Sequence, residues 1–252
     1  MLKVSDLALA YGEHPVLEGA SIAVDEGQFV SLVGPSGSGK SSILRAVMGL
    51  QKPSAGTVDL NVPHREVGIL FQDDALLPWR TARENVMLGL RIRGIAEAQA
   101  AEQAYDWLAR LGLADFTERY PRTLSGGQRK RVALAQVLAL APKFLLMDEP
   151  FASLDAIVRH RVTQDLLDLV EEERLSVLLV THDLEEAQVL SDVIYLLSQG
   201  PRAHIRHRYT VPIPRPRDLI KARSDPSFAP LLERLWRDLS AEVDAAHQSG
   251  TA

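Results

Sequence analysis

Apolar residues fall into short runs with strand-like spacing along much of the chain. These runs occupy residues 4–10, 16–24, 29–33, 57–60, 67–71, 144–147, 176–181 and 193–197. The first two alternate between apolar and polar positions, as strands with one solvated face do. The runs at 29–33, 144–147 and 176–181 are almost continuously apolar, which is typical of parallel strands buried on both faces. The pattern therefore predicts an α/β fold in which an antiparallel β subdomain accompanies a parallel sheet.

A second period, with apolar residues three and four positions apart, indicates the helices. It recurs at residues 41–50, 81–89, 96–111, 129–140 and 156–172. Three of these segments follow one another within about residues 75–141, and glycine and proline residues separate them. We therefore expect a helical lobe inserted between two parts of the α/β core.

The pattern changes again after the last core strand. It predicts a C-terminal strand and helical tail over residues 201–252, and residues 1–200 as the main domain. Residues 202–217 contain five arginines and no acid, with apolar residues at alternate positions. We expect an edge strand whose arginines face the solvent, where they resist pairing with another strand. An amphipathic helix is expected around residues 231–239, and residues 240–252 are expected to fray.

Composition excludes several classes of protein. The 252 residues are 46% hydrophobic and 24% charged, which is ordinary for a domain with its own core. There is no cysteine, which excludes disulfides and thiolate metal sites, and the net charge of -5 argues against a nucleic-acid binder. No apolar run reaches the length of a membrane span, and residues 1–6 lack the pattern of a secretory signal. Any role at a membrane would therefore go through a partner.

The most specific motif is GPSGSGKS at residues 34–41, between a predicted strand and a predicted helix. Its glycines allow a tight turn in which backbone N–H groups converge on an anion at the helix N-terminus. Lys40 would add a positive charge on the β- and γ-phosphates, and the Ser41 hydroxyl would be a ligand of Mg²⁺. A glycine-rich turn with a solvated lysine is the alternative, and it does not explain why strand, loop and helix agree. The predicted nucleotide-binding residues are Gly34, Pro35, Ser36, Gly37, Ser38, Gly39, Lys40, Ser41 and Ser42.

Polar side chains follow the strands that we expect to end beside this loop. Asp148 comes directly after a buried strand, where it could bind Mg²⁺, and Glu149 could orient or deprotonate a water molecule. His182 follows the next buried strand, and we predict that it contacts a γ-phosphate. Gln72 could reach Mg²⁺ or the attacking water through its amide oxygen, although a solvated loop glutamine is the commoner case.

A second helix start, at Ser125, Gly126, Gly127 and Gln128, also has the features of an anion site. Ser125 is a good N-cap, and the two glycines expose backbone N–H groups at the positive end of the helix dipole. One nucleotide does not need both loops of the same chain, so this loop could serve a neighbour's nucleotide. Considered alone, it would be interpreted as a capped helix with a flexible entry.

Tyr11 ends the first predicted strand and has two interpretations that the sequence leaves open. Its ring could stack on adenine, or it could be a half-buried tyrosine at a strand end.

Together these motifs resemble those of the ATP-binding cassette ATPases. The motifs that carry the resemblance are the loop at 34–41, Gln72, the loop at 124–128, Asp148-Glu149, Ser153-Leu154-Asp155 and His182. The resemblance covers residues 2–199, and its second loop is far more specific than its first. It implies a head-to-tail homodimer, or a pair of related ATPase subunits, that encloses two ATP molecules with Mg²⁺.

The resemblance also implies a role for each matched residue. Each ATP would touch Lys40 of one subunit and the Ser125-Gly126-Gly127 loop of the other. Tyr11 would stack on adenine, Gln72 would link to the lobe and bind the metal, Glu149 would be the catalytic base, Asp155 would lie at the dimer contact and His182 would sense the γ-phosphate.

A narrower resemblance lies in FQDDALLPW at residues 71–79 and PRPRD at residues 214–218. These segments look like those of bacterial importer ATPases for nitrate, aliphatic sulfonates and taurine, whose relatives also carry pyrimidine vitamin precursors. Gln136 and Ala152 depart from this pattern, which has arginine and glycine there. The resemblance implies transmembrane permease subunits, an extracytoplasmic solute-binding protein that acts indirectly, and a peripheral position on the cytoplasmic face of the inner membrane.

Two other functions compete with transport. A soluble ATPase of the same superfamily could act on DNA or ribosomes, but DNA-repair members insert a long coiled coil where this chain has a short lobe, and ribosome-acting members generally carry two cassettes. An ATP-binding regulatory module would not need both Glu149 and His182. Residues 76–80, LLPWR, could receive a permease segment with Trp79 as an anchor; the alternative is that Trp79 packs into the lobe.

Overall fold

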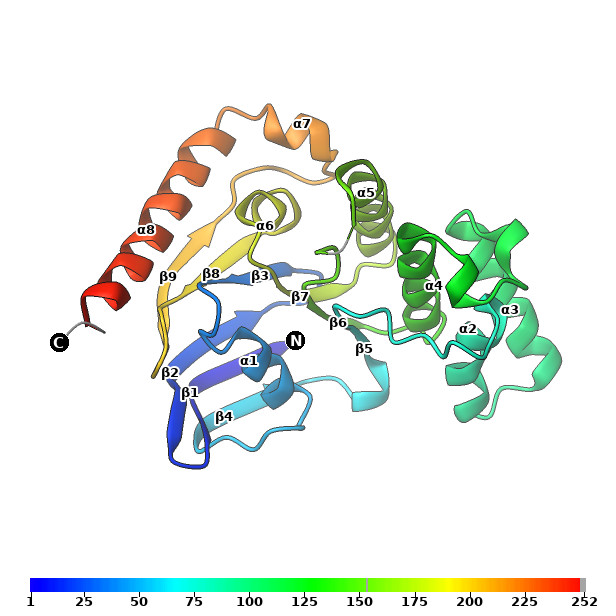
Figure 1. Ribbon diagram of the computed structural model, residues 1–252, viewed down its shortest axis with the longest axis horizontal. Coiled ribbons are helices and arrows are strands. Elements are labelled where there is room, and N and C mark those ends of the chain that lie inside the picture. Colours follow the sequence, from blue (N-terminus) through cyan, green and yellow to red (C-terminus); the bar gives the residue numbers. More distant parts are fainter. Residues whose placement is uncertain (153, 250–252) are drawn as a thin grey trace.

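The computed structural model describes residues 1–152 and 154–249, and within these residues the strands form two sheets (Figure 1). The smaller sheet is antiparallel and has the order β2 (His14–Val24), β1 (Leu2–Tyr11), β4 (Ala55–Leu60). The main sheet has the order β5 (Val67–Leu70), β6 (Phe144–Asp148), β7 (Ser176–Val180), β3 (Phe29–Val33), β8 (Val193–Leu197), β9 (Ile205–Thr210). The strands of both sheets follow the predicted runs to within a few residues.

Strands β5, β6, β7, β3 and β8 of the main sheet are parallel, so their carboxyl ends lie at one edge. The predicted phosphate loop follows β3, Gln72 lies just beyond β5, and His182 lies just beyond β7. Asp148 is the last residue of β6, and Glu149 comes directly after it. The topology therefore brings segments that are far apart in the sequence to the edge where open α/β sheets bind ligands. Strand β9 is antiparallel to β8 and makes the sheet mixed.

The main sheet is apolar on both faces because both faces are covered. In β6, Phe144 and Leu146 pack toward the antiparallel sheet and helix α1 (Lys40–Val47), whereas Leu145 and Met147 pack toward α5 (Ala156–Glu172) and α6 (Leu184–Leu190). All four side chains are fully buried, and the two layers lie on opposite sides of the sheet in Figure 1. Burial of each such side chain typically stabilises the fold by about 1.5–3 kcal/mol.

The lobe consists of helices α2 (Ala82–Ile92), α3 (Glu97–Arg110) and α4 (Gly126–Leu138), which lie to one side of the sheets (green in Figure 1). Helix α4 begins at Gly126 rather than at residue 129, because Ser125 caps it and both glycines form its first turn. The interpretation that Trp79 packs into the lobe is wrong, since this residue is 69% exposed. Short 3-10 turns at His64–Glu66, Ala114–Phe116 and Pro121–Thr123 complete the connections.

The C-terminal segment contains β9, α7 (Leu219–Arg223) and α8 (Phe228–Ser249). Helix α8 runs along the side of the main sheet that carries α6 (red in Figure 1). The expectation that residues 240–252 fray is wrong as far as Ser249, because alanine and other helix-forming residues continue the helix there; residues 250–252 lie outside the described residues. The boundary at residue 200 stays a prediction, although β9 pairs with β8 of the main sheet.

The expectation of a solvated basic face holds for only part of residues 202–217. Arg202, Arg206 and Arg208 are exposed, but Arg215 is half-buried and Arg217 is 5% exposed. The strand ends at Thr210, so the alternation of faces does not continue through the prolines that follow. Beyond the strand, the chain turns inward and brings both arginines to a carboxylate.

That carboxylate is Asp192, which joins the C-terminal segment to the start of β3. It accepts hydrogen bonds from Arg215 (Nη2–Oδ2 2.7 Å), from Arg217 (Nη2–Oδ1 3.0 Å) and from the backbone N–H of Phe29 (2.9 Å). Arg217 also donates to the carbonyl oxygens of Ile213 and Leu190. The PRPRD segment therefore has a structural role as an anchor.

We expect Asp192→Ala to destabilise the protein by about 3 kcal/mol, because it leaves the buried Arg217 cation without its carboxylate. In a chain of this size the melting temperature should fall by roughly 6–12 °C. The control is Glu18→Ala, which removes the partner of Arg202 in a pair with both side chains more than 60% exposed. Such pairs contribute about 0–1 kcal/mol. Equal shifts for the two variants would show that Asp192 is no anchor.

Candidate nucleotide-binding site

The loop between β3 and α1 turns sharply and lies against β2. Gly39 has φ +93° directly before the first residue of α1, a conformation that favours glycine. A Cβ atom at this position would lie 2.8 Å from Cγ1 of Val16, so the close approach also requires glycine. The loop therefore holds the N-terminus of α1 open toward the cleft in front of it.

Lys40 lies inside this loop and is 7% exposed. Its Nζ donates hydrogen bonds to the carbonyl oxygens of Gly34 (2.8 Å) and Pro35 (2.7 Å). Burial lowers the pKa of Lys40, and the nearby carboxylates of Glu149 and Asp148 oppose this effect. The loop thus positions a cation at its centre, as phosphate binding requires.

Ser41 and Asp148 are brought together from α1 and β6. The Ser41 hydroxyl donates to Oδ1 of Asp148 at 3.1 Å, and burial raises the pKa of Asp148 while this hydrogen bond lowers it. A hydroxyl and a carboxylate are oxygen ligands that suit Mg²⁺, which commonly takes its remaining ligands from water and substrate phosphates. Among the described residues, no hydrogen bond joins the side chain of Gln72, which is exposed, to either group.

Glu149 and His182 form a pair at the same edge of the sheet. His182 Nδ1 lies 2.7 Å from Oε2 of Glu149. Glu149 has φ +44°, which is uncommon for a residue other than glycine, and its backbone N–H donates to Val180 of β7 at 2.8 Å. Backbone strain of this kind clusters at active sites, where the surrounding structure maintains it.

One cleft of about 370 Å³ brings residues of the phosphate loop together with Tyr11 and Glu149. It is lined by Tyr11, Val16, Ser36, Gly37, Gly39, Lys40, Ser41, Ser42 and Glu149. Tyr11 is 46% exposed, and its hydroxyl is held by Gln51 (2.9 Å) and Ser42 (3.2 Å). Its ring is therefore available at the edge of the cleft; stacking on adenine stays a prediction.

The second predicted loop does not line this cleft. Ser125 and Gln128 form a capping box in which the Ser125 hydroxyl accepts from the Gln128 N–H (3.3 Å) and the Gln128 amide oxygen accepts from the Ser125 N–H (2.9 Å). Gly127 is required for packing, because a Cβ there would lie 2.2 Å from Cγ1 of Val158 in α5. Of the described residues that line the cleft, none comes from this loop.

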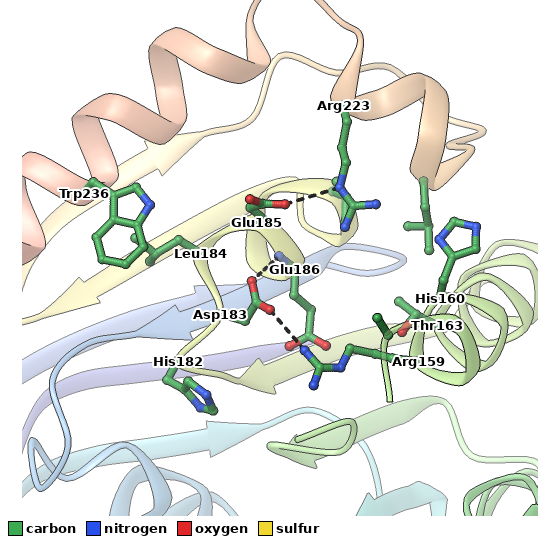
Figure 2. A pocket seen from close by; sticks show the side chains of 13 residues that line it. Arg159, His160, Thr163, His182, Asp183, Leu184, Glu185, Glu186, Arg223 and Trp236 are labelled. Atoms are coloured by element: carbon green, nitrogen blue, oxygen red, sulfur yellow. Dashed lines mark hydrogen bonds and ion pairs between the residues drawn. The ribbon is translucent and has the colours of Figure 1, made fainter. Parts of the chain in front are cut away.

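The pattern of apolar residues predicted neither helix α6 nor the burial of Glu186. Asp183 caps the helix by accepting a hydrogen bond from the Glu186 N–H (3.0 Å), and Figure 2 shows this contact beside His182. An aspartate followed three residues later by glutamate is a start signal that the sequence contains. The Glu186 side chain itself accepts a hydrogen bond from Thr181 (2.5 Å). Its burial depends on the packing of α6 on the sheet.

Burial raises the pKa of Glu186 from 4.5 to about 7. The pKa of Glu186 is higher in the folded state than in the unfolded state. The contribution of this carboxyl group to the free energy of unfolding is therefore fully present below pH 4.5 and is lost as the pH rises through about 7. The loss amounts to about 3 kcal/mol. We expect Glu186→Gln, which keeps an acceptor for Thr181, to gain stability relative to the parental chain between pH 5 and 8 in thermal unfolding. The exposed neighbour Glu185→Gln should follow the parental pH profile; a Glu186→Gln profile parallel to the parental one would contradict the assignment.

Comparison with known proteins decides the family. The model of the ABC transporter family matches residues 17–152, which include the phosphate loop, the Ser125 loop and the Asp148-Glu149 strand end. The chain belongs to the ABC transporter family.

Relatives match nearly the whole chain. The aliphatic sulfonates import ATP-binding protein SsuB 1 of Paracoccus denitrificans is 43% identical over 96% of this chain and 94% of its own length. The bicarbonate transport ATP-binding protein CmpD of Synechococcus elongatus is 38% identical over 86% of this chain and 81% of its own. Among solved structures, the dimeric post-hydrolysis state of the ATP-binding cassette MJ0796 with ADP and Pi has a TM-score of 0.73 at 32% identity, and covers 84% of this chain and 99% of its own.

These matches confirm the predicted family and the α/β cassette fold with an antiparallel β subdomain. The chain is an ATP-binding cassette ATPase that hydrolyses ATP for transport. Of the helices in the described residues, none is long and apolar enough to cross a membrane.

Proposed function

We propose that this ABC ATPase energises a bacterial importer for a small anionic solute, from the cytoplasmic face of the membrane and through permease subunits. The observation that carries the proposal is the Glu149–His182 pair (2.7 Å) at the sheet edge that also holds Lys40, Ser41 and Asp148. Sulfonates and bicarbonate, the solutes in the names of the two relatives, are both small anions. A periplasmic or other extracytoplasmic binding protein would select the solute.

The cleft residues would divide the work of ATP hydrolysis. Lys40 and the backbone of residues 34–41 would hold the phosphates, and Ser41, Asp148 and Gln72 would supply oxygen ligands for Mg²⁺. When bound, Mg²⁺ would neutralise charge on the phosphate oxygens. Glu149 would accept the proton of the attacking water, while His182, at hydrogen-bond distance, would orient the carboxylate and contact the γ-phosphate.

Two chains would complete each site. The Ser125 loop lies outside the cleft of its own chain and is partly exposed. Its capping box uses the N–H groups of Ser125 and Gln128, so those of Gly126 and Gly127 would be the ones offered to a nucleotide on a partner subunit. The MJ0796 cassette is dimeric, which supports the same arrangement for this chain. Asp155 would lie at the dimer contact; Ser153, in the same motif, lies outside the described residues.

Permease contact would use the segment that follows Gln72. Asn85 is fully buried in α2, accepts a hydrogen bond from the Leu77 N–H (2.7 Å) and donates to the carbonyl oxygens of Leu77 (3.2 Å) and Arg80 (3.2 Å). These bonds hold the segment in one conformation while Trp79 is 69% exposed. A large aromatic side chain displayed on an ordered loop is suited to anchor a partner.

We expect Trp79→Ala to leave folding and basal ATPase unchanged but to reduce transport sharply in the assembled importer. Truncation of an aromatic anchor typically costs about 2 kcal/mol or more of binding free energy. The test compares melting temperature, ATPase of the isolated chain, and uptake of a sulfonate and of bicarbonate by vesicles that contain the complex. Trp236→Ala is the matched control, because that tryptophan is 55% exposed on α8. Parental uptake by Trp79→Ala, or an equal loss with Trp236→Ala, would contradict the proposed contact. Failure of the parental complex to take up any small anion would contradict the proposed class of solute.

A further inference from the structure

A pocket of about 510 Å³ lies where α5 and α6 of the core meet α7 of the C-terminal segment. Figure 2 shows it from close by, with His182 and Arg223 among the residues that line it. Of its lining residues that the structure describes, none also lines the nucleotide cleft. Pockets that bind small molecules typically have volumes of about 300–1,000 Å³. This cavity is therefore separate from the cleft and large enough for a ligand of its own.

Helix α5 contributes two polar atoms without a partner to this pocket. Thr163 is 4% exposed, and its Oγ1 is buried without a hydrogen bond to any described residue. The Nε of Arg159 is likewise buried and unpartnered, whereas its Nη2 donates to the carbonyl oxygen of Leu154 (3.0 Å). Arg159 and Thr163 are four positions apart, so they lie on the same face of the helix. Because buried polar atoms without a partner are rare, this pair indicates a ligand that accepts hydrogen bonds.

The acidic side chains at the pocket already have partners within the chain. Asp183 accepts a hydrogen bond from the Glu186 N–H (3.0 Å) and lies 3.6 Å from Nη1 of Arg159. Glu185 pairs with Arg223 of α7 (3.4 Å). Glu186 accepts a hydrogen bond from a threonine hydroxyl (2.5 Å), and burial raises the pKa of its carboxyl group to about 7, which weakens its repulsion of an anion. A cationic ligand would have to displace one of these contacts, whereas an anionic ligand could bind the two unpartnered donors.

Three aliphatic side chains also line the pocket, namely Leu184 and Val189 of α6 and Leu219 of α7. A carboxylate has two acceptor oxygens, one for each unpartnered donor, and it is a planar partner for a guanidinium group. A short hydrocarbon chain attached to it would lie against the aliphatic side chains. We propose that this pocket binds a small aliphatic carboxylate, with its head group at Arg159 and Thr163.

The experiment adds hexanoate to the full chain labelled in its leucine and valine methyl groups and follows the methyl resonances by NMR. The resonances of Leu184, Val189 and Leu219 should shift in a saturable manner. Hexan-1-ol lacks the charge and hexylammonium carries the opposite charge, so both should bind about ten times more weakly or not at all. No saturable shift with hexanoate, or equal binding of either analogue, would overturn the proposal.

Thr163→Val should weaken the binding of hexanoate about tenfold, because it removes a hydrogen bond to a charged group. Its melting temperature should equal or exceed the parental value, since the lost hydroxyl has no partner among the described residues. Thr57→Val is the matched control, because Thr57 is an exposed threonine of β4. This control should bind hexanoate with the parental affinity.

Arg159→Met is the second variant, and it should weaken hexanoate binding by roughly tenfold or more because the head group loses its cation. Its control is Arg161→Met, which removes an exposed arginine from the same helix and should not change binding. Parental affinity in Thr163→Val or in a folded Arg159→Met would overturn the proposed site, as would an equal loss in the controls. These measurements use neither ATP nor a permease, so their outcome is independent of the proposed function.

Discussion

Glu149→Gln should bind ATP normally and hydrolyse it about 10²–10⁴ times more slowly than the parental chain. A positioned group that accepts a proton in the transition state typically contributes a factor of this size. The substitution keeps the shape of the side chain and retains an atom within reach of His182, which lies 2.7 Å from the carboxylate. ATP binding should survive because Lys40 and residues 34–41, which hold the phosphates, are unchanged.

The measurement combines steady-state hydrolysis with light scattering in the presence of ATP. Because ATP is bound but not consumed, the variant should accumulate as an ATP-bound dimer. Glu173→Gln is the control, since this glutamate pairs with Arg110 on the surface, remote from the cleft. Hydrolysis at the parental rate by Glu149→Gln would mean that another group accepts the proton.

Lys40→Ala should abolish ATP binding or hydrolysis, because the loop loses the side-chain cation at its centre. Ser125→Arg should also abolish hydrolysis, but through the partner's site. The arginine would place bulk and charge where the γ-phosphate bound to the partner subunit must fit. Each variant alone carries a lesion in both sites of a symmetric dimer. Both should therefore be inactive when assayed separately.

Mixing the two variants should restore activity. In a mixed dimer both lesions fall in one site, which leaves the other site intact, so random pairing of equal amounts should give about a quarter of the parental activity. Interdependence of the two sites would reduce that value further, so ATP-dependent dimerisation of the same mixture in the Glu149→Gln background is the second readout. If mixing restored neither hydrolysis nor ATP-dependent dimers, the two loops could not belong to different subunits.

Local sequence was enough to predict the elements and the chemistry of the cleft. Helix α5 and strand β8 have the predicted bounds, Ala156–Glu172 and Val193–Leu197, because the period of apolar residues directly reflects which face is buried. The phosphate loop was predictable because its glycines, lysine and serine are consecutive and act through their own backbone. Asp148, Glu149 and His182 lie at the carboxyl ends of buried strands, and parallel strands of one sheet necessarily end at the same edge.

Contacts between distant segments were decided only by the tertiary structure. In helix α4, Lys130 contacts a carbonyl oxygen 58 residues earlier, and Arg217 contacts a carboxylate 25 residues earlier. The residues next to each of these two cations do not show whether its side chain is solvated or buried. The exposure of Trp79 depends on how Asn85 holds its loop. The sequence contains two anion-binding helix starts, but only the packing of the lobe against the core separates the Ser125 loop from the cleft of its own chain. Periodicity and capping act over a few residues, whereas burial, ion pairing and the separation of the two loops depend on which surfaces meet after folding.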